Sequence, residues 1–216
     1  MTLPPLPDVL ERALAAAPVA PVLTIDDADR AEPLADALWA GGVRVFEVTL
    51  RTPAGLRALE RMAAMAHDAA VGVGTVLHPD DLRRARDAGA AFAVSPGHTQ
   101  ALLDAAAELA LPLVPGVATA SEMMRARDAG ASLQKFFPAE PLGGRAVLKS
   151  MAEPLADLRF WPTGGIDEAT AAAYLALPNV VAVGSSRIAP RQAVADADWA
   201  TIRANAARSL DACRRA

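Results

Sequence analysis

The chain has 216 residues, of which 21 are Lys or Arg, 25 are Asp or Glu, 53% are hydrophobic and one is cysteine. This length and hydrophobic fraction fit one full core and a single domain over residues 1–216. The net charge of −4 offers no attraction to a polyanion, so we expect no nucleic-acid partner. The lone Cys213 argues against a disulfide framework and against a thiolate metal cluster.

The most apolar early stretch, residues 13–25, is predicted to be neither a signal peptide nor a membrane span. It is broken by Pro18 and Pro21 and follows acidic residues rather than a basic leader. We therefore expect a cytoplasmic protein without a membrane partner. Only Lys135 and Lys149 are lysines among the 21 basic residues, so a lysine in an apolar stretch is unusual for this chain.

Short apolar stretches alternate with alanine-rich helical stretches along the chain. The expected strands are Ala20–Ile25, Val43–Leu50, Ala70–Leu77, Ala91–Pro96, Leu111–Val117, Leu133–Pro138, Leu158–Thr163 and Val180–Ser185. One helix between successive strands is typical of parallel pairing through right-handed crossovers. Eight such units predict an α/β protein with a closed (β/α)8 TIM barrel, and an extra N-terminal helix at about residues 6–17 that caps the barrel bottom.

An open doubly wound sheet is the alternative architecture, but residues 26–29 lack the glycine-rich turn that usually follows its first strand. Two helices have clear boundaries. One begins at Pro79 and ends near Gly89, and the other begins after Thr119 and ends at Gly130. Glu122 follows Thr119 at the spacing of a capping box.

The second expected strand carries polar side chains on one face. Alternation places Glu47, Thr49 and Arg51 on one face, whereas the opposite face is apolar and suits the helix layer. The polar face is therefore expected inside the barrel, where active residues lie at the C-terminal ends of strands. Because a buried carboxylate needs a partner, an internal Glu47–Arg51 ion pair that only supports the barrel is the alternative to a catalytic Glu47.

The sixth expected strand places Lys135 among aromatic residues, on the same face as Phe137. Desolvation favours the neutral amine of a lysine, and a neutral amine attacks a ketone. Schiff-base catalysis also requires a nearby acid–base group, for which Glu47 is the candidate. The alternative is a lysine whose stem packs inside while its ammonium group reaches the barrel mouth.

Two glycine-bearing loops suggest a phosphate site. They are the segment Thr163-Gly164-Gly165 after the seventh strand and the segment Gly184-Ser185-Ser186 after the eighth. Many barrels bind phosphate with these two loops, because glycine lets backbone N–H groups approach an anion. Arg187 follows, turned either into this site, where it adds a cation, or outward into solvent. His67, His78 and His98 show no metal-ligand spacing, and His67 is expected on a helix surface.

Five segments together resemble the bacterial 2-keto-3-deoxy-6-phosphogluconate (KDPG) aldolases, whose family also includes 2-keto-4-hydroxyglutarate (KHG) aldolase activity. The segments are Glu47-Val48-Thr49-Leu50-Arg51-Thr52, Val71-Gly72-Val73-Gly74-Thr75-Val76-Leu77, Ser95-Pro96-Gly97, Lys135-Phe136-Phe137-Pro138-Ala139-Glu140 and Pro162-Thr163-Gly164-Gly165-Ile166. The resemblance runs from about the first strand to the eighth. It implies a class I pyruvate aldolase on a (β/α)8 barrel, without metal or other cofactor, commonly assembled as a homotrimer.

The resemblance also implies roles for individual residues. Lys135 matches the Schiff-base lysine and Glu47 the general acid–base. The substrate-binding positions are Arg51 and Thr75 at the pyruvate carboxylate, Pro96 and Phe137 along the pocket, and Thr163, Gly164, Gly165, Gly184, Ser185 and Ser186 at the distal and phosphate end. The chain departs from the family where Arg187 replaces a tryptophan and where His98 replaces an apolar residue.

The expected activity is cleavage of KDPG, a small 2-keto acid, to pyruvate and glyceraldehyde 3-phosphate. Aldolases for 4-hydroxy-2-oxoglutarate or for the galactonate epimer are the alternatives of the same class, and Thr163 favours the gluconate epimer on the resemblance. Two functions from other classes remain as alternatives. One is a phosphate-binding barrel isomerase without a covalent step, and the other is a catalytically silent binding protein. Reduction with borohydride in the presence of pyruvate discriminates them, because only a Schiff base gives a stable adduct.

Overall fold

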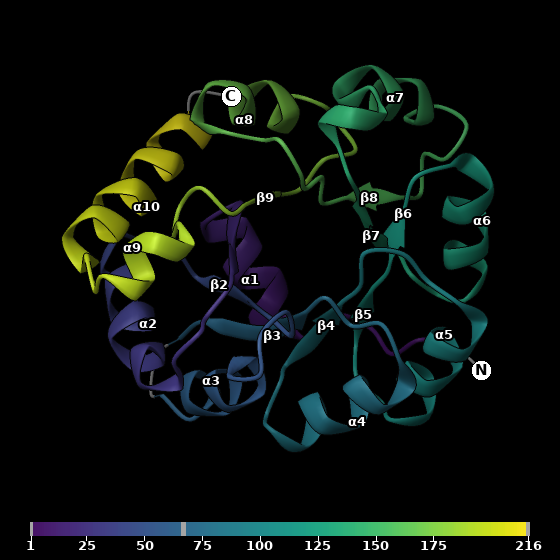
Figure 1. Cartoon of the computed structure of the whole chain (residues 1–216). Helices are drawn as coiled ribbons and strands as arrows, with labels where there is room; N and C mark the ends of the chain where they lie inside the picture. The colour runs from purple at the N-terminus through teal and green to yellow at the C-terminus, as the bar shows by residue number, and fades with distance from the viewer. Residues whose placement is uncertain (1, 66–67, 215–216) are drawn as a thin grey trace.

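Parallel strands form the centre of the molecule and helices surround them in the computed structural model, which describes residues 2–65 and 68–214 (Figure 1). His67 lies outside the described residues. The strands are β1 (Val19–Leu23), β2 (Val45–Thr49), β3 (Ala70–Gly74), β4 (Phe92–Val94), β5 (Leu113–Val114), β6 (Gly116–Val117), β7 (Leu133–Phe136), β8 (Arg159–Phe160) and β9 (Val183–Ser185). All their pairings are parallel.

The sheet closes into the predicted barrel. Its two hydrogen-bonded groups run β5-β4-β3-β2-β1-β9 and β6-β7-β8. Segments β5 and β6 are two parts of one barrel strand, and the bridges Phe160↔Val180 and Thr163↔Gly184 join β8 and its following loop to the β9 side. The (β/α)8 prediction is therefore confirmed, and the open-sheet alternative is wrong.

The observed strands are shorter than the predicted ones. The fifth is interrupted at Pro115, which has no N–H to donate to the ladder although its carbonyl accepts from the Lys135 N–H at 2.9 Å. The eighth begins at Val183 rather than Val180, and the third ends at Gly74 rather than Leu77. The predicted strands were too long because apolar residues continue into the adjoining loops, which do not belong to the regular ladder.

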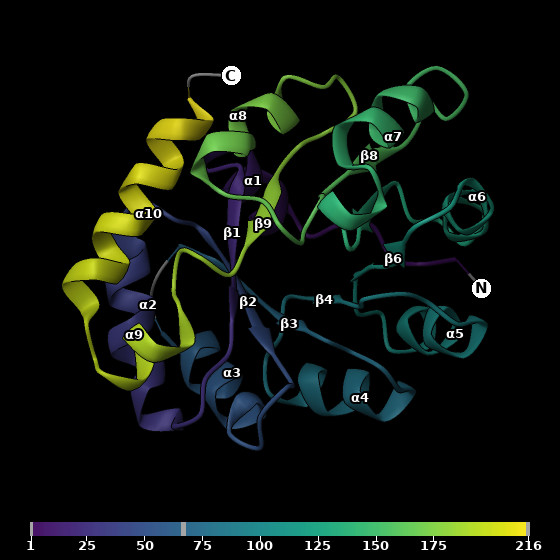
Figure 2. The same ribbon diagram turned by 45° about the horizontal axis from the view of Figure 1, so that its top comes forward.

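Helices cover the outside of the barrel, and the first of them lies across its bottom. They are α1 (Asp8–Ala16), α2 (Ala31–Ala40), α3 (Gly55–Ala63), α4 (Pro79–Asp87), α5 (Gln100–Glu108), α6 (Ala120–Asp128), α7 (Gly144–Met151), α8 (Glu168–Leu175), α9 (Arg191–Ala195) and α10 (Trp199–Cys213). The tilted view shows α10 along α2, and α10 also packs on α8 (Figure 2). In the part of the chain that the structure describes, no helix is both long and apolar enough to cross a bilayer.

The core has two layers, and alternation along the strands assigns each residue to one of them. Val45 points into the barrel, where it packs with Phe92, Trp161 and Leu10. Phe46 and its neighbours on the opposite face pack against the surrounding helices. Helix α1 supplies Leu10 and closes the barrel bottom as predicted, so the interior opens at the end where the strands finish.

Candidate active site

A buried ion pair spans the interior of the barrel. Lys135 on β7 donates from Nζ to Oε1 of Glu47 on β2 at 2.9 Å, with side chains 4% and 0% exposed. The Lys135 ammonium also lies 5.4 Å from the centre of the Phe137 ring. Among the described residues, the ammonium is buried rather than exposed at the mouth, and the Glu47 carboxylate pairs with Lys135 rather than with Arg51.

One carboxylate oxygen of Glu47 is left for a reactant. Its Oε2 is buried and has no hydrogen-bond partner among the described residues. An unpaired buried acceptor costs free energy and is therefore uncommon. The arrangement places a free carboxylate oxygen beside a primary amine, which is what proton transfer to and from that amine requires.

Two glycines make room for these side chains. A Cβ on Gly74 of β3 would collide with the Glu47 carboxylate, and a Cβ on Gly184 of β9 would collide with the Thr163 hydroxyl. The sequence reasoning assigned Gly184 to the phosphate loop. The structure shows a further reason for glycine there, which is the space that the buried Thr163 side chain occupies.

A cavity of about 230 Å³ opens at the barrel mouth, beside the Phe137 ring. It is lined by Val22, Arg51, Phe137, Thr163, Gly164, Gly165, Ile166, Gly184, Ser185, Ser186 and Arg187. The structure thus brings together most of the residues proposed for substrate binding. Thr163 Oγ1 is buried there without a hydrogen-bond partner among the described residues, which leaves it available to a ligand hydroxyl.

Arg51 and Thr75 meet at the ends of β2 and β3. Arg51 Nε donates to Thr75 Oγ1 at 3.1 Å, and Arg51 lines the cavity. Thr75 has φ +61°, in the left-handed region that a β-branched residue rarely adopts. Such strain is concentrated at functional sites, and here it presents the hydroxyl to the guanidinium.

Three residues that the sequence singled out, Pro96, Ser185 and His98, make contacts other than those expected. Pro96 is not among the lining residues of the cavity, and its carbonyl packs against Gly116 so closely that no Cβ would fit there. Ser185 lines the cavity, but its hydroxyl donates to the Ile166 carbonyl at 3.0 Å. His98 Nδ1 contacts the Gly116 carbonyl at 2.9 Å and so ties the loop after β4 to the strand beside Lys135.

Arg187 extends from the loop after β9 with a side chain 71% exposed, 3.8 Å from Asp167 Oδ2. The Thr170 hydroxyl, the first N–H groups of α8 and the Arg187 charge hold the pKa of the Asp167 carboxyl below its usual range, although partial burial opposes them. The Arg187 side chain is therefore exposed to solvent, as one of the two alternatives expected, but the residue still lines the cavity.

Sequence reasoning missed two apolar lining residues, Val22 and Ile166. Val22 lies two residues after the inward-pointing Ala20, so both lie on the same face of β1, and Val22 pairs in register with Glu47. The period of two along the strand was therefore the signal that would have found it. Ile166 lies in an irregular loop, for which no periodicity applies.

The described residues contain no cluster of side chains that could bind a metal ion. No group of three or more His, Cys, Asp or Glu side chains converges there in a way that could hold a metal ion. The polar partner of Lys135 is the Glu47 carboxylate, which suits proton transfer, whereas the hydroxyl and guanidinium groups that suit anion binding line the cavity.

Comparison with known proteins identifies the family. The family described as "KDPG and KHG aldolase" matches residues 10–205. A curated KHG/KDPG aldolase of Escherichia coli K12 is 46% identical over 189 residues, covering 88% of this chain and 89% of the relative. The chain belongs to the KDPG and KHG aldolase family. As a member of that family it is an aldolase.

Two further relatives of this aldolase support the assignment. A 2-dehydro-3-deoxy-phosphogluconate aldolase of Dickeya dadantii is 46% identical and covers 90% of this chain and 91% of its own. A crystal structure of KDPG aldolase from Legionella pneumophila superposes with a TM-score of 0.88 at 42% identity, covering 92% of this chain and 96% of its own. That crystal structure holds pyruvate as a covalent carbinolamine intermediate.

Proposed function

We propose that this aldolase cleaves KDPG to pyruvate and glyceraldehyde 3-phosphate through a Schiff base on Lys135, with one domain of residues 1–216 as the catalytic unit. The observation that carries the proposal is the buried contact of 2.9 Å between Lys135 Nζ and Glu47 Oε1, with Lys135 against the Phe137 ring that lines the cavity. A lysine enclosed in this way is held in one orientation, and its neighbouring carboxylate takes the proton that must leave before the amine attacks.

The reaction begins when Glu47 accepts a proton from the Lys135 ammonium. The neutral amine attacks the C2 carbonyl carbon, and Glu47 returns a proton as the carbinolamine loses water to give a cationic iminium. Glu47, directly or through a water, then removes the C4 hydroxyl proton. The C3–C4 bond breaks, its electron pair enters the iminium, and the aldehyde leaves an enamine on Lys135. Protonation at C3 and hydrolysis release pyruvate and restore the amine.

The two ends of the cavity fit the two ends of this substrate. Arg51, held by Thr75, is a fixed cation for the C1 carboxylate, which a guanidinium binds in a bidentate way. Thr163 offers its unpaired hydroxyl to the sugar hydroxyls. The loops of Gly164, Gly165 and Ser186 form the distal wall, where backbone N–H groups can approach the phosphate.

The substrate is tested by measuring pyruvate release from KDPG and from 2-keto-4-hydroxyglutarate side by side. The expected result is a kcat/KM for KDPG well above that for hydroxyglutarate, because only KDPG carries the phosphate that the distal loops bind. Equal efficiency on the two substrates would contradict the phosphate assignment and favour the hydroxyglutarate aldolase. The galactonate epimer of KDPG, assayed in parallel, measures the preference at C4.

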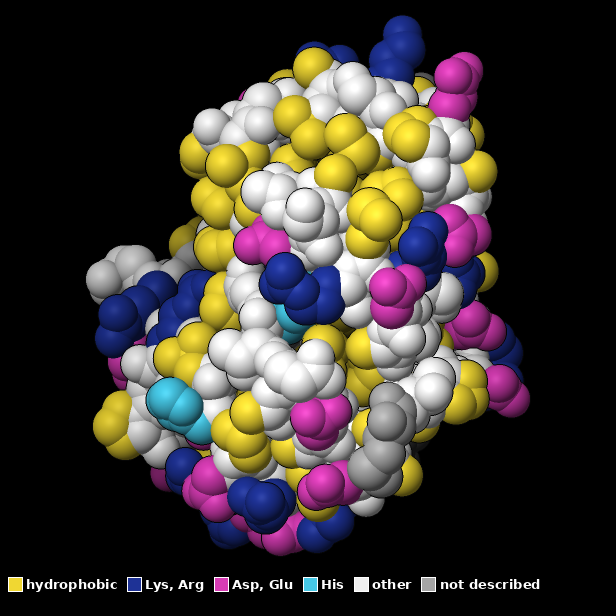
Figure 3. Space-filling model, turned by 90° about the vertical axis from the view of Figure 1, so that its right-hand side faces the viewer, with side chains coloured by type: hydrophobic (Ala, Val, Ile, Leu, Met, Phe, Trp, Pro, Cys, Tyr) yellow, Lys and Arg dark blue, Asp and Glu magenta, His cyan; other side chains and the backbone are white. Residues whose placement is uncertain are grey.

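We also propose that the protein is a homotrimer, as the family resemblance implies, and that it acts in the cytoplasm in the Entner–Doudoroff pathway. Large hydrophobic side chains are exposed at Leu77, Met124 and Leu142, and hydrophobic side chains gather between charged ones on the face seen in Figure 3. Subunit contacts commonly cover such surface. Light scattering is expected to give three times the mass of one chain, and a monomer mass would contradict the proposal.

A further inference from the structure

We propose that Arg187 is a specificity-determining residue that leaves Asp167 and binds the phosphate of the substrate when the cavity is occupied. The inference rests on the proposed function and deepens it, because it assigns the charge that recognises the distal anion. It concerns a position where the chain differs from the family pattern.

Among the described residues that line the cavity, two are charged, and both are arginines. Arg51 lies after β2 and Arg187 after β9, while none of the described lining residues is a carboxylate. The strands β2 and β9 flank β1 on either side, so they lie about 10 Å apart at the usual strand spacing. That separation matches an extended six-carbon chain with an anion at each end.

The present partner of Arg187 holds it weakly. The 3.8 Å ion pair joins side chains 71% and 34% exposed, and exposed pairs of this kind contribute little to stability. Asp167 moreover uses Oδ1 to cap α8, through the N–H groups of Ala169 and Thr170. The carboxylate keeps these bonds when Arg187 leaves, so the exchange of partner costs little.

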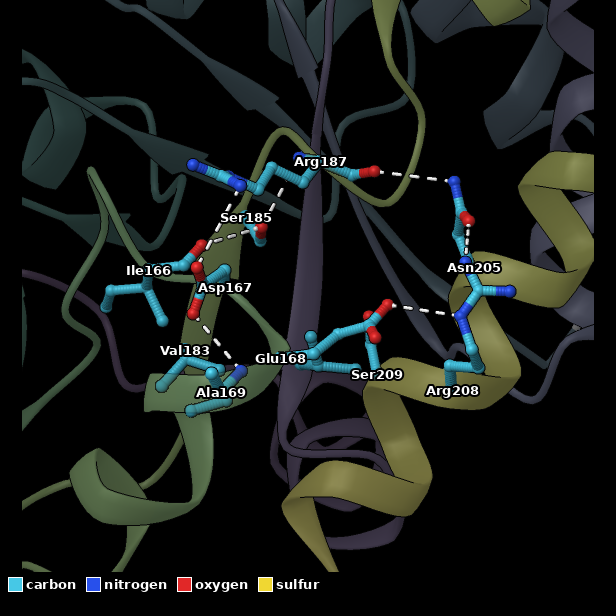
Figure 4. A pocket seen from close by; sticks show the side chains of 12 residues that line it. Ile166, Asp167, Glu168, Ala169, Val183, Ser185, Arg187, Asn205, Arg208 and Ser209 are labelled. Carbon is cyan, nitrogen blue, oxygen red and sulfur yellow. Dashed lines mark hydrogen bonds and ion pairs between the residues drawn. The ribbon is translucent and has the colours of Figure 1, made fainter.

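A groove of about 390 Å³ between α8 and α10 lies on the other side of Arg187. Figure 4 shows the Arg187 side chain extending toward Asp167, while its carbonyl faces Asn205 and Arg208 pairs with Glu168. Arg187 lines both the groove and the cavity, together with Ile166 and Ser185. Its guanidinium therefore stands at the boundary, within a side-chain rotation of the loops that form the distal wall.

A phosphate is the better partner for this guanidinium. The planar group donates to two phosphate oxygens at once, with charge-assisted hydrogen bonds stronger than neutral ones. The bound substrate also excludes water from the cavity, which strengthens the attraction relative to the solvated pair with Asp167. A neutral substrate end offers no such gain and leaves Arg187 with Asp167.

The test compares KDPG with 2-keto-3-deoxygluconate, which has the same carbon chain without the phosphate. We expect Arg187→Gln to raise KM for KDPG about 10-fold or more, the effect of losing a hydrogen bond between charged groups, and to leave KM for the unphosphorylated acid within about twofold. The matched control is Arg208→Gln. Arg208 is also exposed and paired with a carboxylate, but it lines only the groove, so both KM values are expected to stay unchanged.

A second variant distinguishes substrate binding from support of the loop. Asp167→Asn keeps an oxygen for the α8 cap but removes the charge that competes for Arg187, so KM for KDPG is expected to fall or stay constant. If the ion pair only supported the loop, Asp167→Asn would raise KM as Arg187→Gln does, which would overturn the proposal. A KM for KDPG that is unchanged in Arg187→Gln would overturn it as well.

Failure of the proposed function is recognised separately. Borohydride labelling with pyruvate is measured on every variant, because it depends on Lys135 and not on the phosphate. Normal labelling with an unchanged KM contradicts only the role of Arg187. Absence of both labelling and KDPG cleavage in the parent protein contradicts the aldolase mechanism itself.

Discussion

At the scale of single residues, the distinctive feature is the Glu47 carboxylate, whose Oε1 accepts a hydrogen bond from Lys135 while its Oε2 has no partner among the described residues. The sequence predicted both residues and their shared interior, because alternation along β2 and the rarity of lysine are visible without a structure. It did not predict that Arg51 bonds to Thr75 instead of Glu47, since that pairing depends on the left-handed backbone at Thr75.

Replacement of Glu47 by glutamine tests its role in proton transfer. Gln keeps the shape and one hydrogen bond to Lys135 but cannot accept a proton, so kcat is expected to fall by about 10²- to 10⁴-fold. The free energy of unfolding is expected to change less, because the glutamine amide keeps the packing of the side chain and an oxygen that accepts from Lys135. Steady-state kinetics and urea unfolding on the same sample measure both. A variant that unfolds readily, yet whose folded fraction is fully active, would indicate a structural role.

At the scale of elements, the barrel strands were predicted in number and order but not in length. Largely apolar segments such as residues 75–77 and 180–182 extend the strands in sequence, because apolar composition continues into the loops beyond the paired residues. Helix boundaries were predicted better, since the α6 capping box and the α4 proline are local signals. The cavity loops were predicted as glycine-bearing loops of a phosphate site, whereas the side-chain contacts that they make depend on the barrel closure.

The two inward glycines of β3 provide a matched pair of variants. A Cβ on Gly72 would meet the Phe92 ring, and one on Gly74 would meet the Glu47 carboxylate. We expect Gly72→Ala to lower the free energy of unfolding by about 1–3 kcal/mol through overpacking, with little change in kcat. Gly74→Ala is expected to lower kcat at least 10-fold, because it displaces Glu47. Full activity of Gly74→Ala would contradict the geometry proposed for Glu47.

The capping box of α6 predicts a pH-dependent stability. Burial opposes ionisation of Glu122, but the N–H groups of Ala118 and Thr119 outweigh it and lower the pKa of this carboxyl. Glu122→Ala is therefore expected to cost about 1 kcal/mol at pH 7. A lowered folded-state pKa contributes stability above the unfolded pKa of about 4.3 that is lost as pH falls through the folded value. The difference from the parent should shrink below about pH 4, and a constant difference down to pH 3 would contradict this account.

At the scale of the whole molecule, the barrel separates stability from chemistry. Its bottom is filled by apolar side chains and closed by α1, while the polar groups lie at the mouth. Leu10→Ala removes a fully buried side chain of α1 and is expected to cost about 2–5 kcal/mol. Its kcat/KM is expected to stay within about twofold of the parent at a temperature where both are folded, and a large selective loss of activity would show that the two ends are coupled.

The most direct measurement of the central claim is reduction with borohydride in the presence of pyruvate, followed by mass spectrometry of the peptides. Lys135 is enclosed beside Glu47, whereas Lys149 is exposed on α7, so Lys149→Arg is the matched control for Lys135→Arg. We predict a single three-carbon adduct on Lys135, retained in Lys149→Arg, and no adduct or turnover in folded Lys135→Arg. An adduct on Lys149, or full activity of Lys135→Arg, would contradict the Schiff-base mechanism.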